Sequence, residues 1–194
     1  PSPGTPSPAL PPAANDTAQY VADVTSHAVM TMDDVLLPTD DGVLTNEGGE
    51  YGKRVAIQGD TAVAVAVGVG AYVFTRNNAT GAWSSVAKLA RGDIFARPYF
   101  GASLAISQDE RVVVVGSPGT LGTGSVFVYS RDASDSSVWS QTSVLDSGIV
   151  DVGFGRSAAM SGDTVVIAGT RSAYVFTQDS QNSSSMWTTV ARLH

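Results

Sequence analysis

The side chains that most often carry catalysis or bind metals are scarce in this sequence of 194 residues. There is no cysteine, and the two histidines, His27 and His194, lie far apart in the chain. The absence of cysteine excludes a disulfide framework and a thiolate zinc site. A Ser-His-acid triad or a histidine metal site has almost no material to draw on.

Two serines match part of a nucleophile elbow, in which a serine follows a glycine by two positions. The matches are Gly101-x-Ser103 and Gly155-x-Ser157. Both occupy the same position in a pattern that recurs along the chain, so a structural role explains them better. We therefore predict that the chain is not an enzyme, that it has no catalytic residues and that it needs no cofactor.

The charge of the chain excludes two classes of partner. The formal net charge is −7 and the sequence pI is about 4.5, and there is no run of lysine or arginine. Nucleic acid and anionic membrane surfaces are therefore poor partners. The apolar runs, such as 112–115, have the length of strands and not of membrane spans, so membrane insertion is not expected.

The first fifteen residues, PSPGTPSPALPPAAN, contain six of the nine prolines. Proline fixes φ and lacks an amide proton, which favours extended polyproline II. We predict an extended arm over residues 1–16. Its Ser-Pro and Thr-Pro pairs resemble modules of the hydroxyproline-rich glycoproteins of plants and algae. This resemblance implies O-glycosylation or proline hydroxylation at Ser2, Pro3, Thr5, Pro6, Ser7 and Pro8.

The rest of the chain contains one pattern three times, at about 51–89, 100–145 and 154–193. Each copy opens with an aromatic-Gly pair, with an aspartate nine residues after the aromatic. A Val/Ala-rich run, an aromatic-Val-aromatic triplet, a tryptophan and a leucine follow. The residues of this signature are Tyr51, Gly52, Trp83, Phe100, Gly101, Trp139, Phe154, Gly155 and Trp187.

Each copy is expected to form four short strands. The first is led by the aromatic-Gly pair and ends at a Gly-Asp or Gln-Asp turn. The runs VVVV and VVIA lack a polar side, so these second strands should be covered on both faces. Aromatics two positions apart in the third strand, such as Tyr72 and Phe74, share one face. We expect an all-β fold of four-stranded sheets that stack on each other.

The pattern Phe-Gly-x-Ser-x-Ala, then Val-Val-Gly-Ser-Pro, then Val-Phe-Val-Tyr resembles the FG-GAP repeat family of integrin-α-type blades. The resemblance implies a β-propeller or partial propeller over residues 50–194. Propellers close with roughly four to eight blades, so three copies are too few. Residues 17–49 are interpreted as a degenerate blade or donated strands. Alternatively, the chain is a fragment or an arc that other copies complete.

Integrin-type blades bind calcium in Asp-rich loops, where several carboxylates converge on one cation. The corresponding turns here are 59–61, 108–110 and 162–164, with one or two acids each. The segments 132–137 and 39–42 hold two acids apiece, which are too few for a calcium cage. We expect no metal site, and calcium stays a minor alternative.

Two short motifs concern the outside of the cell. Asn-x-Ser/Thr acceptors for N-glycosylation occur at Asn15, Asn78 and Asn182. The tripeptide Arg91-Gly92-Asp93 is a weak ligand motif in the link between two copies. With the family resemblance, the glycosylation signals favour an extracellular location.

These features predict a non-enzymatic extracellular structural protein that self-assembles or packs with partner chains, as in a glycosylated filament. Incomplete repeat arrays expose apolar faces, and such faces require a partner. The partners expected are other copies or other extracellular proteins, with glycans as a further option. The alternative is an FG-GAP-type adhesion or carbohydrate-binding module. A fragment of an enzyme is the least favoured hypothesis.

Overall fold

The computed structural model describes residues 51–90, 99–119, 123–179 and 186–194. All of them belong to one compact unit of the chain. The predicted arm over 1–16 and the predicted degenerate blade over 17–49 lie outside the described residues.

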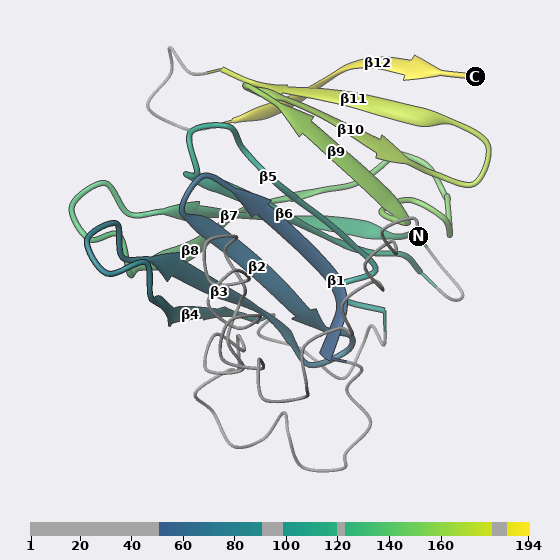
Figure 1. Ribbon diagram of the computed structural model, residues 1–194. Helices are drawn as coiled ribbons and strands as arrows, with labels where there is room; N and C mark the ends of the chain where they lie inside the picture. Colours follow the sequence, from purple (N-terminus) through teal and green to yellow (C-terminus); the bar gives the residue numbers. More distant parts are fainter. Residues whose placement is uncertain (1–50, 91–98, 120–122, 180–185) are drawn as a thin grey trace, which may run out of the picture. The chain divides into compact units, whose positions relative to one another are not determined.

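In these residues, twelve strands form three four-stranded antiparallel sheets, which we call blades 1 to 3 (Figure 1). Within each blade the strands lie in chain order. Blade 1 contains β1 (Tyr51–Gln58), β2 (Thr61–Ala66), β3 (Gly70–Arg76) and β4 (Trp83–Leu89). Blade 2 contains β5 (Ser103–Ile106), β6 (Val112–Ser117), β7 (Ser125–Arg131) and β8 (Trp139–Leu145). Blade 3 contains β9 (Ser157–Ser161), β10 (Thr164–Ala168), β11 (Ala173–Gln178) and β12 (Trp187–Leu193). The all-β, blade-type fold class predicted from the sequence is confirmed.

The three blades share one strand register. The central pairs are Val63 with Val73, Val114 with Val128, and Val166 with Val175. A register shift interrupts the pairing of the third and fourth strands just after the second valine of each pair. Positions in different blades can therefore be compared directly, because equal register means an equal place in the blade.

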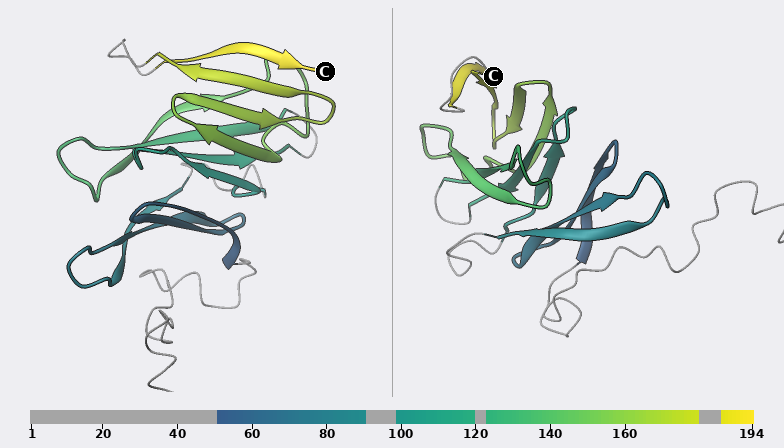
Figure 2. Two further views of the ribbon diagram at one scale, coloured as in Figure 1. Left: turned by 45° about the horizontal axis from the view of Figure 1, so that its top comes forward. Right: turned by 90° about the vertical axis from the view of Figure 1, so that its left-hand side faces the viewer.

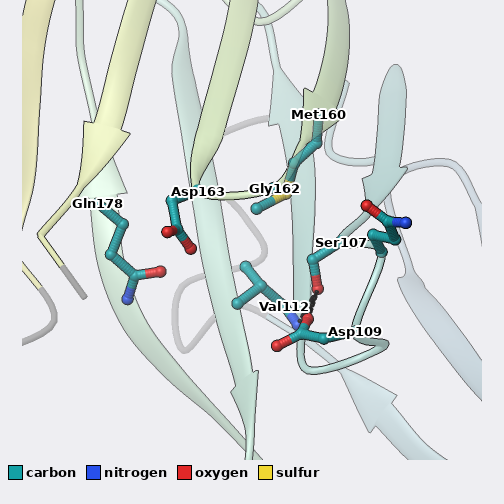
Figure 3. Close-up of a pocket in the computed structure, with 8 residues that line it drawn as sticks. Ser107, Asp109, Val112, Met160, Gly162, Asp163 and Gln178 are labelled. Atoms are coloured by element: carbon teal, nitrogen blue, oxygen red, sulfur yellow. Dashed lines mark hydrogen bonds between the residues drawn. The ribbon is translucent and has the colours of Figure 1, made fainter.

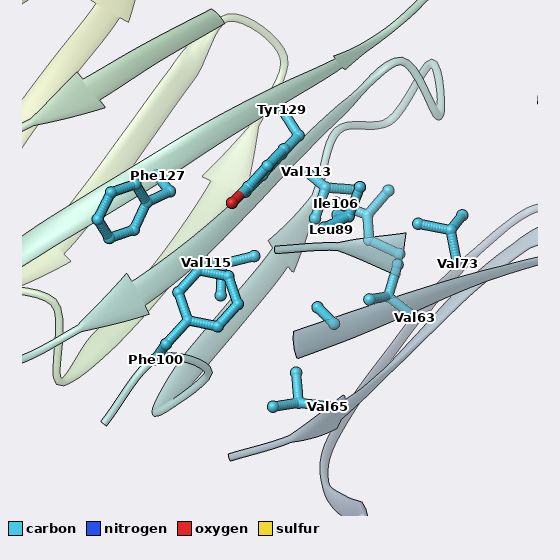
Figure 4. Close-up of a cluster of buried hydrophobic side chains, with 11 residues drawn as sticks. Val63, Val65, Val73, Leu89, Phe100, Ile106, Val113, Val115, Phe127 and Tyr129 are labelled. Carbon is cyan, nitrogen blue, oxygen red and sulfur yellow. The ribbon is translucent and has the colours of Figure 1, made fainter. Parts of the chain in front are cut away.

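Each blade has two faces of different composition, as the alternation of side chains along a strand requires. One face, which includes Val63 and Val73 in blade 1, carries valines, small residues and the last leucine of the fourth strand. The other carries the aromatics of the third strand. The face of blade 1 that carries Val63 and Val73 packs on the aromatic face of blade 2. The two faces form one core cluster, which includes Phe127 and Tyr129 (Figure 4).

The same arrangement recurs between blades 2 and 3. Val114, Val128 and Leu145 of blade 2 pack with aromatics of blade 3, including Phe154 and Phe176. The two further views in Figure 2 show the three blades following one another. The fold thus stacks one kind of interface twice.

The expected start of the first strands is wrong in two blades. In blades 2 and 3 the strand begins two residues after the aromatic-Gly pair, at Ser103 and Ser157. The glycines of these pairs, Gly101 and Gly155, have φ of 92° and 90°, outside the extended region of regular strands. In blade 1 the strand does include the pair, and Gly52, with a φ of 79°, lies at a register shift between Tyr51 and Arg54.

Candidate functional site

The aromatic-Gly pairs lie at the boundaries between blades. Phe100 is buried against blade 1 and Phe154 against blade 2. A Cβ at Gly101 would lie 2.1 Å from Cγ1 of Val65, which belongs to the preceding blade. The glycine is therefore required twice, by its positive φ and by the close approach of the neighbouring blade.

Hydrogen bonds also cross the boundaries between blades. The amide of Gly68 in blade 1 donates to the carbonyl of Phe100 at 3.0 Å. The hydroxyl of Ser103 in blade 2 donates to the carbonyl of Gly155 at 2.8 Å and is buried. Ser157, the other serine of the elbow-like motif, is exposed on β9. The arrangement gives Ser103 a structural partner, a backbone carbonyl.

Glu110 links the first turns of blades 1 and 2. It lies in the turn between β5 and β6 with a φ of 61°, the one positive φ of a residue other than glycine in the described ranges. Its Oε2 accepts a hydrogen bond of 2.7 Å from the hydroxyl of Thr61, and Oε1 accepts one of 3.3 Å from the amide of Asp60. Arg131 donates to the same Thr61 hydroxyl at 2.8 Å. Side chains of blade 2 therefore hold the turn of blade 1.

These contacts bear on the turns considered for calcium. Asp60 accepts a hydrogen bond of 2.8 Å from Nε of Arg76 and forms a salt bridge with it. The Arg76 hydrogen bond holds the pKa of the Asp60 carboxyl below its ordinary value. The described ranges contain no group of three or more potential metal-ligating side chains.

A cavity of about 430 Å³ lies between the first turns of blades 2 and 3 (Figure 3). Asp109, Asp163 and Gln178 line it together with Met160 and Val112. The carboxylate of Asp109 accepts a 2.6 Å hydrogen bond from the hydroxyl of Ser107. The cavity is thus lined on both sides by polar groups.

The three tryptophans begin the fourth strand of each blade, opposite the last residue of the third strand. That opposite residue is an arginine in blades 1 and 2. The guanidinium of Arg76 lies 5.8 Å from the ring centroid of Trp83, and that of Arg131 lies 5.2 Å from that of Trp139. In blade 3 the corresponding residue is Gln178. Each tryptophan thus occupies the same place in its blade.

Asp151, which the sequence analysis did not single out, is a buried carboxylate in the connection to blade 3. One oxygen accepts hydrogen bonds from the amides of Thr170 at 2.8 Å and Gly153 at 3.1 Å. The other accepts the hydroxyl of Tyr174 at 3.1 Å. Burial alone raises the pKa of Asp151, but the hydrogen bonds from Thr170, Tyr174 and Gly153 outweigh it, so the pKa lies below its ordinary value.

One face of blade 3 is partly exposed, and we call it the tail face. Val166 and Leu193 on this face are exposed, and Ala168, Ala173 and Val175 are half-buried. Val166 is 38% exposed, whereas Val63 and Val114, in the same register position, are 1% and 0% exposed. The prediction that VVIA in β10 is covered on both faces is therefore wrong. A blade covers the equivalent face of blades 1 and 2, and no described residue covers this one.

Blade 1 is open along its first strand, and we call this stretch the head edge. Val55 and Ile57 on β1 are 70% and 67% exposed. A Cβ at Gly52 would meet no atom within 4 Å, in contrast to Gly101. On β3 of the same blade, Tyr72 and Phe74 are buried. The head edge is thus limited to β1.

The structure places one of the predicted modification and ligand sites. Asn78 is exposed in the turn between β3 and β4, where Oδ1 of Asn77 accepts hydrogen bonds from the amides of Ala79 and Thr80. The other candidates lie outside the described residues: Asn15, Asn182, Arg91, Gly92, Asp93, Ser2, Pro3, Thr5, Pro6, Ser7 and Pro8. The described part of the chain has no helix with the length and hydrophobicity that a membrane span requires.

The fold of the chain is similar to that of several solved structures. A candidate 6-phosphogluconolactonase from Bacteroides uniformis has a TM-score of 0.56 at 9% identity, over 74% of this chain and 40% of that chain. A second, from Bacteroides fragilis, has 0.54 at 14%, over 74% and 38%. The periplasmic gluconolactonase of Pseudomonas aeruginosa has 0.51 at 19%, over 75% and 40%. The chain therefore spans about two fifths of the length of these proteins. At these identities the likeness shows the fold alone: the three sheets are blades of a β-propeller.

The sequence also identifies the kind of blade. Residues 83–129 match the FG-GAP repeat family, so the chain contains an FG-GAP repeat, as the residues indicated. The match begins in β4 of blade 1 and ends in β7 of blade 2. The repeat in the sequence is therefore offset by one strand from the blade in the structure. No curated protein matches the sequence.

Proposed function

We propose that this chain is a non-enzymatic extracellular structural protein that packs with other copies of itself or with partner chains. The observation that carries the proposal is the tail face. Val166 and Leu193 are exposed there, although Val114 and Leu145, in the same positions of blade 2, are buried. Burying apolar surface stabilises by about 25 cal/mol per Å², so a blade-sized face with a matching partner favours association.

The extracellular part of the proposal is supported by Asn78. An acceptor asparagine must be accessible, and this one is exposed in a turn. We expect the chain from a secretory host to carry a glycan at this position. A mass shift that the substitution Asn78→Gln removes would support this location, and an unmodified Asn78 would count against it.

Absence of catalysis is the second part of the proposal. The lactonase names belong to structural neighbours of at most 19% identity, a level that carries no activity across. The buried Ser103 hydroxyl donates to a backbone carbonyl, and no described histidine is paired with it. Lactone hydrolysis by the purified chain that Ser103→Ala abolishes would overturn this part.

The cavity between the turns of blades 2 and 3 supports one alternative, an adhesion or carbohydrate-binding module. Asp109, Asp163 and Gln178 offer hydrogen-bond acceptors and donors, and sites for small polar ligands combine a few such groups with apolar walls. In this alternative the chain is a monomer, and glycan or calcium binding depends on Asp109 or Asp163.

The experiment that separates the two functions is sedimentation velocity of the full chain over a wide concentration range. The structural function predicts association, which the pair Val166→Glu and Leu193→Glu weakens. Val150→Glu is the matched control, because Val150 is 81% exposed in the connection before blade 3. A compact monomer that binds a glycan array would overturn the structural function and favour the alternative.

A further inference from the structure

The tail face corresponds to one side of an interface that occurs twice inside the chain, and the head edge corresponds to the first-strand part of the other side. The face of blade 1 that contains Val63 packs on blade 2, and the face of blade 2 that contains Val114 packs on blade 3. The exposed tail face of blade 3 is the third member of this series. What should cover it is therefore the leading side of another blade.

The strand register identifies the residues that should meet. Ile57 in blade 1, Ile106 in blade 2 and Met160 in blade 3 occupy one position of the first strand. Ile106 belongs to the core cluster that contains Val63, and Met160 packs against the cluster that contains Val114. Ile57 occupies the position of Ile106 and Met160, and Val166 occupies the position of Val63 and Val114. Both Ile57 and Val166 are exposed.

The open part of blade 1 limits the geometry. Tyr72 and Phe74 are buried already, so a partner reaches blade 1 along β1. Inside the chain, first strands also meet first strands, since β1 contacts β5 and β5 contacts β9. A blade that approaches β1 would therefore bring its own β9 beside it.

We propose that a second copy of this chain is the partner of the tail face, with β1 of one copy beside β9 of the next and Ile57 against Val166. The inference rests on the proposed function and names its partner. Because the two surfaces differ, the contact is heterologous, and copies join head to tail into a closed ring or an open filament. A partner strand can approach β1 at Gly52, because no atom of the chain lies within 4 Å of the place where a Cβ would be.

The test uses two full-length variants, Ile57→Glu, which blocks the head edge, and Val166→Glu, which blocks the tail face. A buried unpaired charge is costly, so each variant alone should lose self-association by about tenfold or more. An equimolar mixture should form a complex of two chains and no larger species, because one intact head edge and one intact tail face remain. At concentrations low enough to keep the wild type monomeric, thermal unfolding midpoints close to that of the wild type establish that both variants fold. Val55→Glu is a second head-edge variant.

The outcomes separate the inference from the function on which it rests. If the wild type assembles and Ile57→Glu still assembles alone, copies pack tail to tail and the head-to-tail inference is wrong, while the structural function stands. A mixture that stays monomeric also contradicts the inference. If the wild type does not assemble at any concentration, the inference fails, and a partner protein would have to be found for the proposed function to survive.

Discussion

Gly101 faces Val65 across the boundary between blades 1 and 2, and a Cβ on the glycine would lie 2.1 Å from the valine Cγ1. The glycine of the aromatic-Gly pair thus allows the two blades to pack closely at this point. An alanine at this point requires the Val65 side chain, or the blade that carries it, to move.

Substitution of Gly101 by alanine should therefore destabilise the fold in two ways. A residue other than glycine at positive φ costs about 1–2 kcal/mol, and overpacking adds about 1–3 kcal/mol. Gly81→Ala is the matched control, because Gly81 has a φ of 76° but a Cβ there would meet nothing within 4 Å. Urea unfolding should show a clearly larger loss for Gly101→Ala. Equal losses would remove close blade approach as the reason for the glycine.

Asp151 should make stability depend on acid pH. Its pKa lies below the ordinary value in the folded chain, so the folded state favours the charged form. This stabilisation is fully present above the unfolded pKa of about 3.9 and is lost as the pH falls through the folded pKa. Asp151→Asn should flatten the fall in unfolding free energy below about pH 4. A profile as steep as that of the wild type would contradict this role.

Truncation of Asp151 should also cost stability at neutral pH. Asp151→Ala leaves the buried hydroxyl of Tyr174 without this acceptor, which costs about 1–3 kcal/mol. Asp146→Ala, in the exposed part of the same connection, should cost about 0.5 kcal/mol or less. Chemical denaturation of both variants at pH 7 checks the difference, and similar small losses would count against a structural role.

Glu110 combines backbone strain with useful contacts, and two substitutions separate them. Glu110→Ala removes the hydrogen bonds to Thr61 and Asp60 but keeps a side chain at positive φ. Glu110→Gly removes the same contacts and relieves the strain. We expect both to be less stable than the wild type, with glycine above alanine by about 1 kcal/mol. Thermal unfolding gives the order, and alanine above glycine would show that φ at this position changes in the variant.

The equivalent valines of blades 1 and 3 offer a direct comparison of covered and exposed faces. Val63→Ala removes two buried methyl groups and should cost about 2 kcal/mol. Val166→Ala should stay within about 0.5 kcal/mol at protein concentrations low enough to keep the chain monomeric. Equal losses in dilute solution would mean that the tail face is covered within the chain.

Much of the fold could be predicted from the sequence, because it depends on patterns inside each copy. The valine-rich second strands, the paired aromatics and the tryptophans fix the strands and their faces. The tail face could not be predicted, since VVIA in β10 reads like VVVV in β6 and only the neighbouring blade decides which is buried. Asp151 was missed because its partners, Thr170 and Tyr174, come about twenty residues later in the chain. The positive φ of Glu110 had no signal in its residue type.

The most direct test of the head-to-tail account is cross-linking between single-cysteine variants, since the natural chain contains no cysteine. Full-length Ile57→Cys and Val166→Cys chains are mixed and treated with a short bifunctional thiol reagent, and Val150→Cys replaces either one as the exposed control. The account predicts a covalent dimer between the Ile57→Cys and Val166→Cys chains, at a yield well above any pair that includes Val150→Cys. Dimers of Val166→Cys with itself in the same or greater yield, or no mixed dimer above the control, would contradict it.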